Sequence, residues 1–179
     1  MNSSLLSSML RKYVTFVSLG LIIALTISTI IHQPSYASNS TFVCEMHQGI
    51  PTTFVKTSHG KKLPLIRWTS SYFPKLTPLN RCRQVSYKFQ KSFDNGTLKT
   101  ITTGTVNKYP VVCAVVSTND VCNSTNVLFT LKPGTNAKKV VENLLDKRAL
   151  AAGKIQNQSS DDTLYIDFDI YLNSLSAEP

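Results

Sequence analysis

Four cysteines constrain the fold of this 179-residue chain more than any other feature of its sequence. All of them lie downstream of a long uncharged apolar run: Cys44, Cys82, Cys113 and Cys122. An even number of cysteines in an exported chain indicates disulfide bonds, and four cysteines allow three pairings. A zinc site needs thiolates in close C-x-x-C pairs, and the sequence has no such pair. We therefore expect two disulfides.

The spacing of the cysteines favours one pairing. Cys113 and Cys122 enclose a short segment with the turn-like sequence STND, which leaves Cys44 to pair with Cys82. In the chain-entropy account, the short loop stabilises the fold by about 2.7 kcal/mol and the long loop by about 3.9 kcal/mol.

Residues 1–37 have the order of a secretory signal peptide. Arg11 and Lys12 precede the uncharged, mostly apolar residues 14–31, and small residues precede the expected cleavage site after Ala37. The alternative is a retained membrane anchor, because that run as a helix would span about 27 Å, close to the hydrocarbon thickness of a bilayer. We favour cleavage, so we expect a periplasmic, extracellular or membrane-peripheral protein.

Residues 38–179 have the length of one domain and a net charge of +7. Residues 38–160 carry 17 basic and 5 acidic side chains, whereas residues 161–179 carry 5 acidic and no basic ones. A basic exported body attracts anionic lipid or glycan, and export argues against nucleic acid as a partner. The alternative is that the acidic end folds against the basic body and the surplus charge only maintains solubility.

Residue patterns predict a single α+β domain over residues 38–179. Helices are expected at residues 78–93 and from Thr135 or Asn136 to Gly153. Strands are expected at residues 40–46, 52–57, 63–68, 97–104, 109–116, 126–132 and 163–172. This order predicts a mainly antiparallel sheet of about six to seven strands with two helices on one face. Pro64 favours an edge position for the third strand or limits this strand to its later half. The most apolar strand, the fifth, is expected at the centre.

Residues 78–93 allow two interpretations, because their apolar side chains fit either a strand period or a helix period. A helix would carry Cys82, Val85 and Phe89 on one inward face. We favour the helix, since Thr77 can cap it and proline follows at its first position.

Residues 163–172 alternate apolar and polar side chains, which predicts a half-buried strand with Phe168 and Ile170 facing inward. Asp167 and Asp169 would then share the other face, about 7 Å apart. Two carboxylates so placed are compatible with calcium but fall far short of an EF-hand loop. We interpret them as a solvated face and expect no metal.

The order of blocks along the chain resembles one family. The blocks are FVCEMHQGIPTTFV, PLIRW before YF, TPLNRCRQVSYKFQ, LKTITTGTVNKYPVVC, and LFTLKPG before a short helix. Together with the four cysteines, they resemble the circadian oscillating protein domain family of cyanobacteria over residues 41–148. The resemblance implies an exported or membrane-associated cyanobacterial protein. The family name describes rhythmic abundance and no chemistry, so the resemblance supplies no catalytic residues.

No catalytic set is visible in residues 38–179. Nucleophilic catalysis needs a serine or cysteine with a histidine and a carboxylate, and neither His47 nor His59 has an evident partner. The cysteines are expected to be oxidised, which removes a thiolate nucleophile. We expect no catalytic residues and no cofactor.

Four basic residues are candidates for binding an anionic ligand: Arg67, Arg81, Lys88 and Lys91. The last three would form one stripe along the first helix, while Arg67 precedes Trp68, which we expect in the core. Cations beside aromatic rings suit an anionic headgroup or a glycan. The alternative is the ordinary polar face of an amphipathic helix.

These observations favour an exported, non-catalytic binding or structural protein of the cyanobacterial envelope or of the periplasmic or lumenal space. We expect a monomer that associates with an anionic lipid or glycan surface. The alternative is a small periplasmic hydrolase or glycan-acting enzyme, in which His47 or His59 would meet a carboxylate in a pocket.

Overall fold

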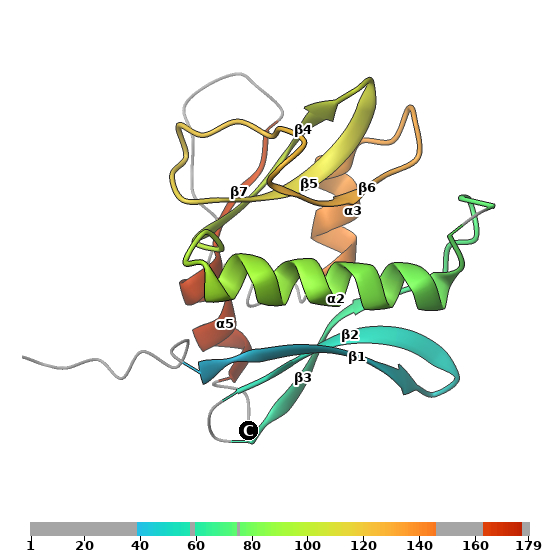
Figure 1. Cartoon of the computed structure of the whole chain (residues 1–179), viewed down its shortest axis with the longest axis vertical. Helices are drawn as coiled ribbons and strands as arrows, with labels where there is room; N and C mark the ends of the chain where they lie inside the picture. Colours follow the sequence, from blue (N-terminus) through green and yellow to red (C-terminus); the bar gives the residue numbers. More distant parts are fainter. Residues whose placement is uncertain (1–38, 58–59, 75, 146–162, 177–179) are drawn as a thin grey trace, which may run out of the picture. The chain divides into compact units, whose positions relative to one another are not determined.

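The computed structural model describes residues 39–57, 60–74, 76–145 and 163–176 (Figure 1). Within these ranges the strands form two antiparallel sheets, one of three strands and one of four, and not the single sheet expected from the sequence. The helices of these ranges are α2, α3 and α5. The predicted signal peptide, residues 1–37, lies outside the described residues.

The first sheet has the order β1-β2-β3 and comprises β1 (Thr41–His47), β2 (Ile50–Lys56) and β3 (Lys62–Arg67). Gln48 and Gly49 join β1 to β2 with positive φ angles of 49° and 77°. Two such residues make the hairpin turn whose twist matches that of the strands. The expected edge position of β3, which contains Pro64, is confirmed.

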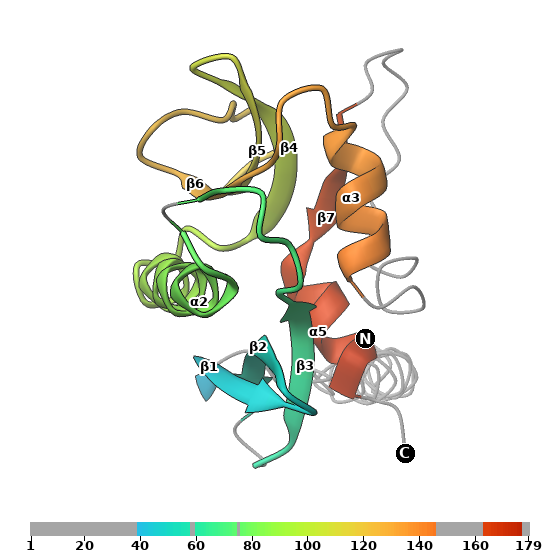
Figure 2. The same ribbon diagram turned by 90° about the vertical axis from the view of Figure 1, so that its right-hand side faces the viewer.

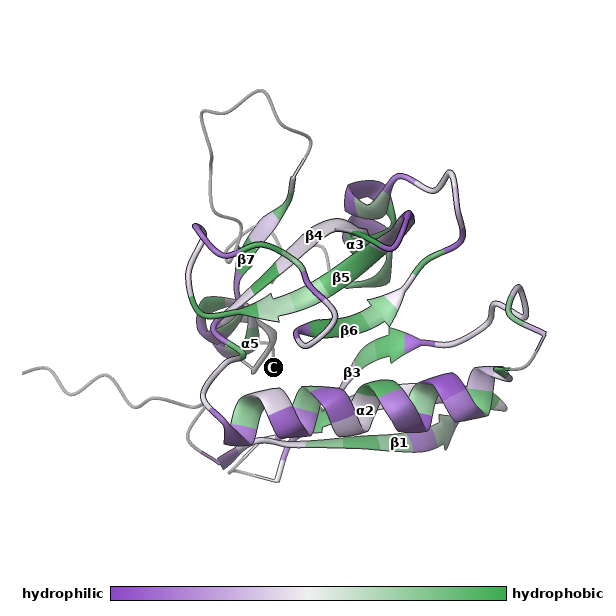
Figure 3. Ribbon diagram, turned by 45° about the horizontal axis from the view of Figure 1, so that its top comes forward, coloured by the Kyte–Doolittle hydropathy of each residue, from purple (hydrophilic) through white to green (hydrophobic). Residues whose placement is uncertain are grey.

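Helix α2 (Pro78–Asp94) confirms the helical interpretation of this segment. The Thr77 hydroxyl caps it by accepting a hydrogen bond from the Asn80 amide at 3.2 Å. Its apolar face carries Cys82, Val85 and Phe89, each at most 4 % exposed, and packs on β1 and β2. Figure 3 shows the alternation of hydrophobic and hydrophilic bands along this amphipathic helix.

Two disulfides account for all four cysteines. Cys44 pairs with Cys82 and thereby links β1 to α2, with 5.5 Å between the Cα atoms. Cys113 pairs with Cys122 across a separation of nine residues, with a Cα–Cα distance of 5.7 Å. This is the pairing expected from the sequence.

The second sheet has the order β6-β5-β4-β7. Its strands are β4 (Thr100–Val106), β5 (Tyr109–Val115), β6 (Val127–Thr130) and β7 (Tyr165–Asp167). The predicted central position of β5 is confirmed, because β5 pairs with both β4 and β6. Residue patterns located the strands but not their partners, and α2 separates the two sheets along the chain.

Helix α3 (Ala137–Leu144) begins at Asn136, whose side chain accepts a hydrogen bond from the Lys139 amide at 2.9 Å. It ends well before Gly153, so its predicted length is wrong. Leu145 is extended and 6 % exposed, which places its side chain in the core instead of on a further helical turn. α3 packs against β3 as well as β4 and β5, so the helices do not share one face of one sheet (Figure 2).

The end of the described chain differs from the predicted strand. Only β7 is extended, and α5 (Phe168–Ser176) follows directly. Asp167 ends the strand, because its carboxylate accepts a hydrogen bond from the Ile170 amide at 2.9 Å and so caps α5. Phe168 and Tyr171 are fully buried, whereas Ile170 is 46 % exposed, as a helical period requires.

One hydrophobic core serves both sheets. Aromatic rings connect its parts: Phe42 of β1 lies 5.4 Å from Phe89 of α2 and 6.1 Å from Phe168 of α5. Phe168 in turn stacks on Tyr171 at 5.8 Å. The acidic C-terminal segment thus folds against the basic body over its described part, where Asp169 lies 3.4 Å from Lys99.

Candidate functional site

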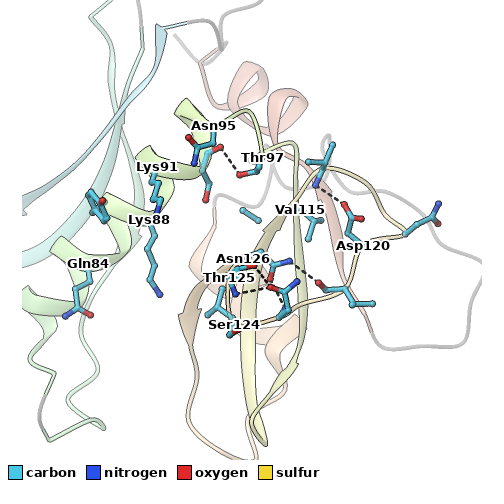
Figure 4. A pocket seen from close by; sticks show the side chains of 18 residues that line it. Gln84, Lys88, Lys91, Asn95, Thr97, Val115, Asp120, Ser124, Thr125 and Asn126 are labelled. Atoms are coloured by element: carbon cyan, nitrogen blue, oxygen red, sulfur yellow. Dashed lines mark hydrogen bonds between the residues drawn. The ribbon is translucent and has the colours of Figure 1, made fainter.

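A large hollow lies between the exposed face of α2 and the segment of residues 116–126 (Figure 4). Its volume is about 750 Å³. Gln84, Lys88 and Lys91 contribute from α2, and Figure 4 shows the Lys88 side chain reaching into the space between α2 and the opposite wall. We call this hollow the α2–loop groove and the segment of residues 116–126 the disulfide loop.

The disulfide loop is held in shape by its own polar groups. The Asp120 carboxylate accepts hydrogen bonds from the amides of Val116 and Ser117 at 3.2 and 2.9 Å. The Asn126 side chain accepts from the Asn123 amide at 2.8 Å and donates to the Val121 carbonyl at 2.9 Å. Together with the Cys113–Cys122 bond, these contacts make one wall of the groove a preformed structure.

Other polar side chains of the groove are left for a ligand. Gln84, Asn95 and Asn119 line it, and within the described residues their side chains have no hydrogen-bond partner. An amide side chain offers both donors and acceptors, so these groups can bind a hydroxyl-rich molecule.

Two lysines from α2 give the groove its positive charge. Lys88 and Lys91 have no ion-pair partner in the part of the chain that the structure describes. Lys88 is exposed, yet neighbouring atoms partly desolvate its ammonium, and this desolvation lowers the pKa of Lys88. An anion in the groove would offset that cost.

Exposed apolar side chains border the same groove. Tyr87 is 67 % exposed and Val121 is 74 % exposed, and they stand on opposite walls. Large exposed apolar groups that gather around a concave surface indicate a binding site more than an inert surface.

A second, smaller hollow, which we call the Arg81 pocket, has a volume of about 210 Å³. Arg81 is 8 % exposed, and its guanidinium carbon lies 4.8 Å from the ring centre of Trp68 and 5.0 Å from that of Phe73. Burial lowers the pKa of Arg81 from its ordinary value. Arg67 and Lys132 add two further cations to the lining of the pocket.

The family model of the circadian oscillating protein COP23 matches residues 41–173. The chain belongs to the COP23 family. The match confirms the resemblance found in the sequence and extends it through β7 into α5. Comparison with curated proteins found no match. Comparison with solved structures found none either.

In this COP23 family member, the stripe of cations expected along α2 is divided between two hollows. Lys88 and Lys91 line the α2–loop groove, whereas Arg81 and Arg67 line the Arg81 pocket. Arg81 shares the stripe but is covered at the start of the helix, where its side chain donates to the Thr130 carbonyl at 3.2 Å. Trp68 is 4 % exposed, which confirms its expected place in the core.

The described lining residues of the two hollows include no histidine. His47 ends β1 and packs edge-on against Phe54 at 5.7 Å, and His59 lies outside the described residues. Over the described ranges, no group of three or more metal-binding side chains is assembled. No helix of those ranges is both long and apolar enough to cross a membrane.

The amide-rich wall of the COP23 groove was not predicted from the sequence. The turn interpretation of STND, residues 117–120, left out Asn123 and Asn126. The available signal was the run of asparagine, serine and threonine around Cys122, within and just after a loop that a disulfide closes. Lys132, which the β6–α3 connection brings to the Arg81 pocket, was not predicted either.

Proposed function

We propose that this COP23 family member is an exported, non-catalytic binding protein that holds an acidic glycan chain in the α2–loop groove. The observation that supports the proposal most directly is the pair Lys88 and Lys91. Both line a groove of about 750 Å³, and among the described residues neither has a carboxylate partner.

The composition of the groove suits a sugar chain. Tyr87 offers an exposed ring, while Gln84, Asn95 and Asn119 offer hydrogen-bonding amides. Rigid aromatic surface combined with adaptable amide and hydroxyl groups is a recurrent solution for binding polar ligands. Two lysines against the single carboxylate of Asp120 favour an acidic glycan over a neutral one.

The shape of the site favours a chain over a membrane surface. A bilayer presents a flat array of headgroups, which a flat or protruding basic surface meets best. Here the disulfide loop forms the wall opposite Lys88, so the lysines lie inside a hollow instead of on a projecting face (Figure 4).

The remaining parts of the proposal have their own support. Disulfides persist in oxidising compartments, so the two present here are compatible with export. Among the described lining residues of the groove, Asp120 is the single carboxylate, and two backbone amides already engage it. A glycosidase needs a pair of carboxylates, so this arrangement supports binding without hydrolysis. The protein acts as a monomer in this proposal.

Calorimetric titration with oligogalacturonate, a poly-acid sugar chain, tests the proposal. Binding is expected to weaken about tenfold or more in the variant Lys88→Gln/Lys91→Gln. It is also expected to weaken as NaCl rises from about 0.05 M to about 0.5 M, because salt screens charge. A matched control is Lys108→Gln/Lys139→Gln, which removes two exposed lysines outside the groove.

Three outcomes would contradict the proposal. Equal binding of a neutral oligosaccharide would remove the role of charge. Pelleting with phosphatidylglycerol vesicles without any binding of oligogalacturonate would favour a membrane partner. Shortening of the oligosaccharide during incubation would show an enzyme.

A further inference from the structure

Arg81 is buried without a carboxylate partner among the described residues. It is 8 % exposed, and within those residues its one side-chain hydrogen bond runs to the Thr130 carbonyl at 3.2 Å. A guanidinium has five N–H donors, and arginine is rarely buried unless its charge is paired. Arg81 lines the pocket, so its remaining donors are available to an acceptor bound there.

Aromatic rings fix the position of this guanidinium. The carbon at its centre lies 4.8 Å from the ring centre of Trp68 and 5.0 Å from that of Phe73. Trp68 is itself held, because its indole N–H donates to the Thr53 hydroxyl at 2.9 Å. A guanidinium positioned in advance loses little side-chain entropy when it binds an anion in a bidentate manner.

The surroundings of Arg81 are positive. Arg67 and Lys132 line the same pocket, and the Lys132 ammonium lies 5.0 Å from the ring centre of Tyr72. The described lining of the pocket contains three cations and no carboxylate. A small cavity with charge of one sign and apolar walls concentrates that field on a ligand.

The rest of the described lining combines three hydroxyl residues, Thr69, Ser70 and Thr135, with aromatic and aliphatic side chains. Phe129, Leu131, Val140 and Leu144 come from β6, the segment after it and α3. The volume of about 210 Å³ corresponds to about seven water molecules at ~30 Å³ each. This size suits a small organic molecule.

We infer that the Arg81 pocket binds a small organic carboxylate with an apolar body. The carboxylate accepts hydrogen bonds from Arg81 with Arg67 and Lys132 close by, and the apolar body lies against Phe129 and Val140. This pocket is a different site from the α2–loop groove, so its ligand can be tested independently of the proposed glycan binding.

Trp68 is the single tryptophan of the chain and lines the pocket, so its fluorescence reports occupancy directly. Titration with cyclohexanecarboxylate is expected to give a saturable change in emission. The neutral cyclohexanecarboxamide, which has the same body, is expected to bind about tenfold more weakly or worse, because hydrogen bonds to a charged group are the stronger ones. Equal responses to the acid and the amide would overturn the inference, as would equal affinity for inorganic phosphate, which lacks the apolar body.

Variants separate binding from folding. Arg67→Gln/Lys132→Gln removes two exposed cations and is expected to weaken cyclohexanecarboxylate about tenfold with an unchanged melting temperature. Arg83→Gln, an exposed neighbour on α2 that does not line the pocket, is expected to bind like the parent protein. Arg81→Lys keeps a charge but not the bidentate fork, and is expected to lose affinity for the acid more than for the amide. Unchanged affinity in both Arg67→Gln/Lys132→Gln and Arg81→Lys would overturn the assignment.

Discussion

Gly104 of β4 lies in direct contact with Cys122. A Cβ atom at Gly104 would come within 2.9 Å of the Cys122 Cβ and 3.0 Å of its Sγ. The backbone of Gly104 does not have a positive φ, so glycine is required here by space and not by conformation. The disulfide loop thus packs on the sheet only because β4 offers a position without a side chain.

Gly104→Ala is expected to destabilise the fold by roughly 1–3 kcal/mol, the usual cost of overpacking a rigid contact. Urea unfolding measures the change. In a Cys113→Ser/Cys122→Ser background the loop can move, so the same substitution should cost less. Thr105→Ala, at the exposed neighbouring position, serves as the control. An equal cost of Gly104→Ala with and without the disulfide would show that the contact is not the cause.

A buried hydroxyl cluster joins β2, α2 and the residue after β3. The Thr53 hydroxyl accepts hydrogen bonds from the Trp68 indole N–H at 2.9 Å and from the Ser86 hydroxyl at 3.0 Å. Thr53→Val keeps the shape but leaves two buried donors without an acceptor. We expect a loss of about 1–3 kcal/mol in the free energy of unfolding, measured by denaturant titration.

Ser86→Ala supplies the internal comparison for that cluster. It removes a donor but leaves the acceptor of Trp68 in place, so it should cost less than Thr53→Val. The double variant should cost less than the sum of the two single variants, because one unpaired donor disappears. Strict additivity would argue against a shared hydrogen-bond cluster.

The helical register of α5 can be tested by a pair of substitutions. Tyr171 is fully buried and Ile170 is 46 % exposed, whereas a continuing strand would reverse the two. Tyr171→Ala is expected to cost about 3–5 kcal/mol, and Ile170→Ala to stay within about 0.5 kcal/mol. Thermal unfolding of both variants distinguishes a helix from a continuing strand at these residues. A larger loss of stability in Ile170→Ala than in Tyr171→Ala would support the strand.

The pKa of Glu45 is expected to depend on salt. Hydrogen bonds from Lys62 and then Lys56 hold the pKa of this carboxyl below its ordinary value of 4.5. A lowered pKa means that the pairs stabilise the fold above the unfolded-state pKa and lose this contribution as the pH falls through the folded-state pKa.

Carboxyl-detected NMR titration should place the Glu45 midpoint below 4.5. About 1 M NaCl should raise it toward the ordinary value, since the pairs are exposed and salt screens them. Lys62→Gln should raise it in low salt as well. If neither high salt nor Lys62→Gln shifts the Glu45 midpoint, the ion pairs of Glu45 with Lys62 and Lys56 do not form in solution.

Local signals in the sequence located most of the elements but not their assembly. Thr77 and Pro78 start α2 where the sequence predicted, because capping acts within one turn. The division into two sheets depends on strand pairing, which periodicity does not encode. At α5 the apolar pattern fits the period of a strand as well as that of a helix, and the cap at Asp167 favours the helix.

For the candidate sites, too, the sequence pattern indicated local grouping but not tertiary contacts. Periodicity grouped Arg81 with Lys88 and Lys91 on one stripe of α2, but it says nothing about what covers each turn. The Thr130 carbonyl of β6 meets the first turn of the helix, so Arg81 is buried while the lysines remain accessible. Lys132 reaches the Arg81 pocket through the connection after β6, a tertiary contact without any local sign in the sequence.

The cap at Asp167 has a practical meaning for anyone who would re-engineer this chain. A single acceptor oxygen of the Asp167 side chain specifies where the strand ends and the helix begins, although the flanking residues are compatible with either structure. Lengthening β7 would therefore call for deleting that oxygen, as in Asp167→Ala, before any apolar residue is exchanged.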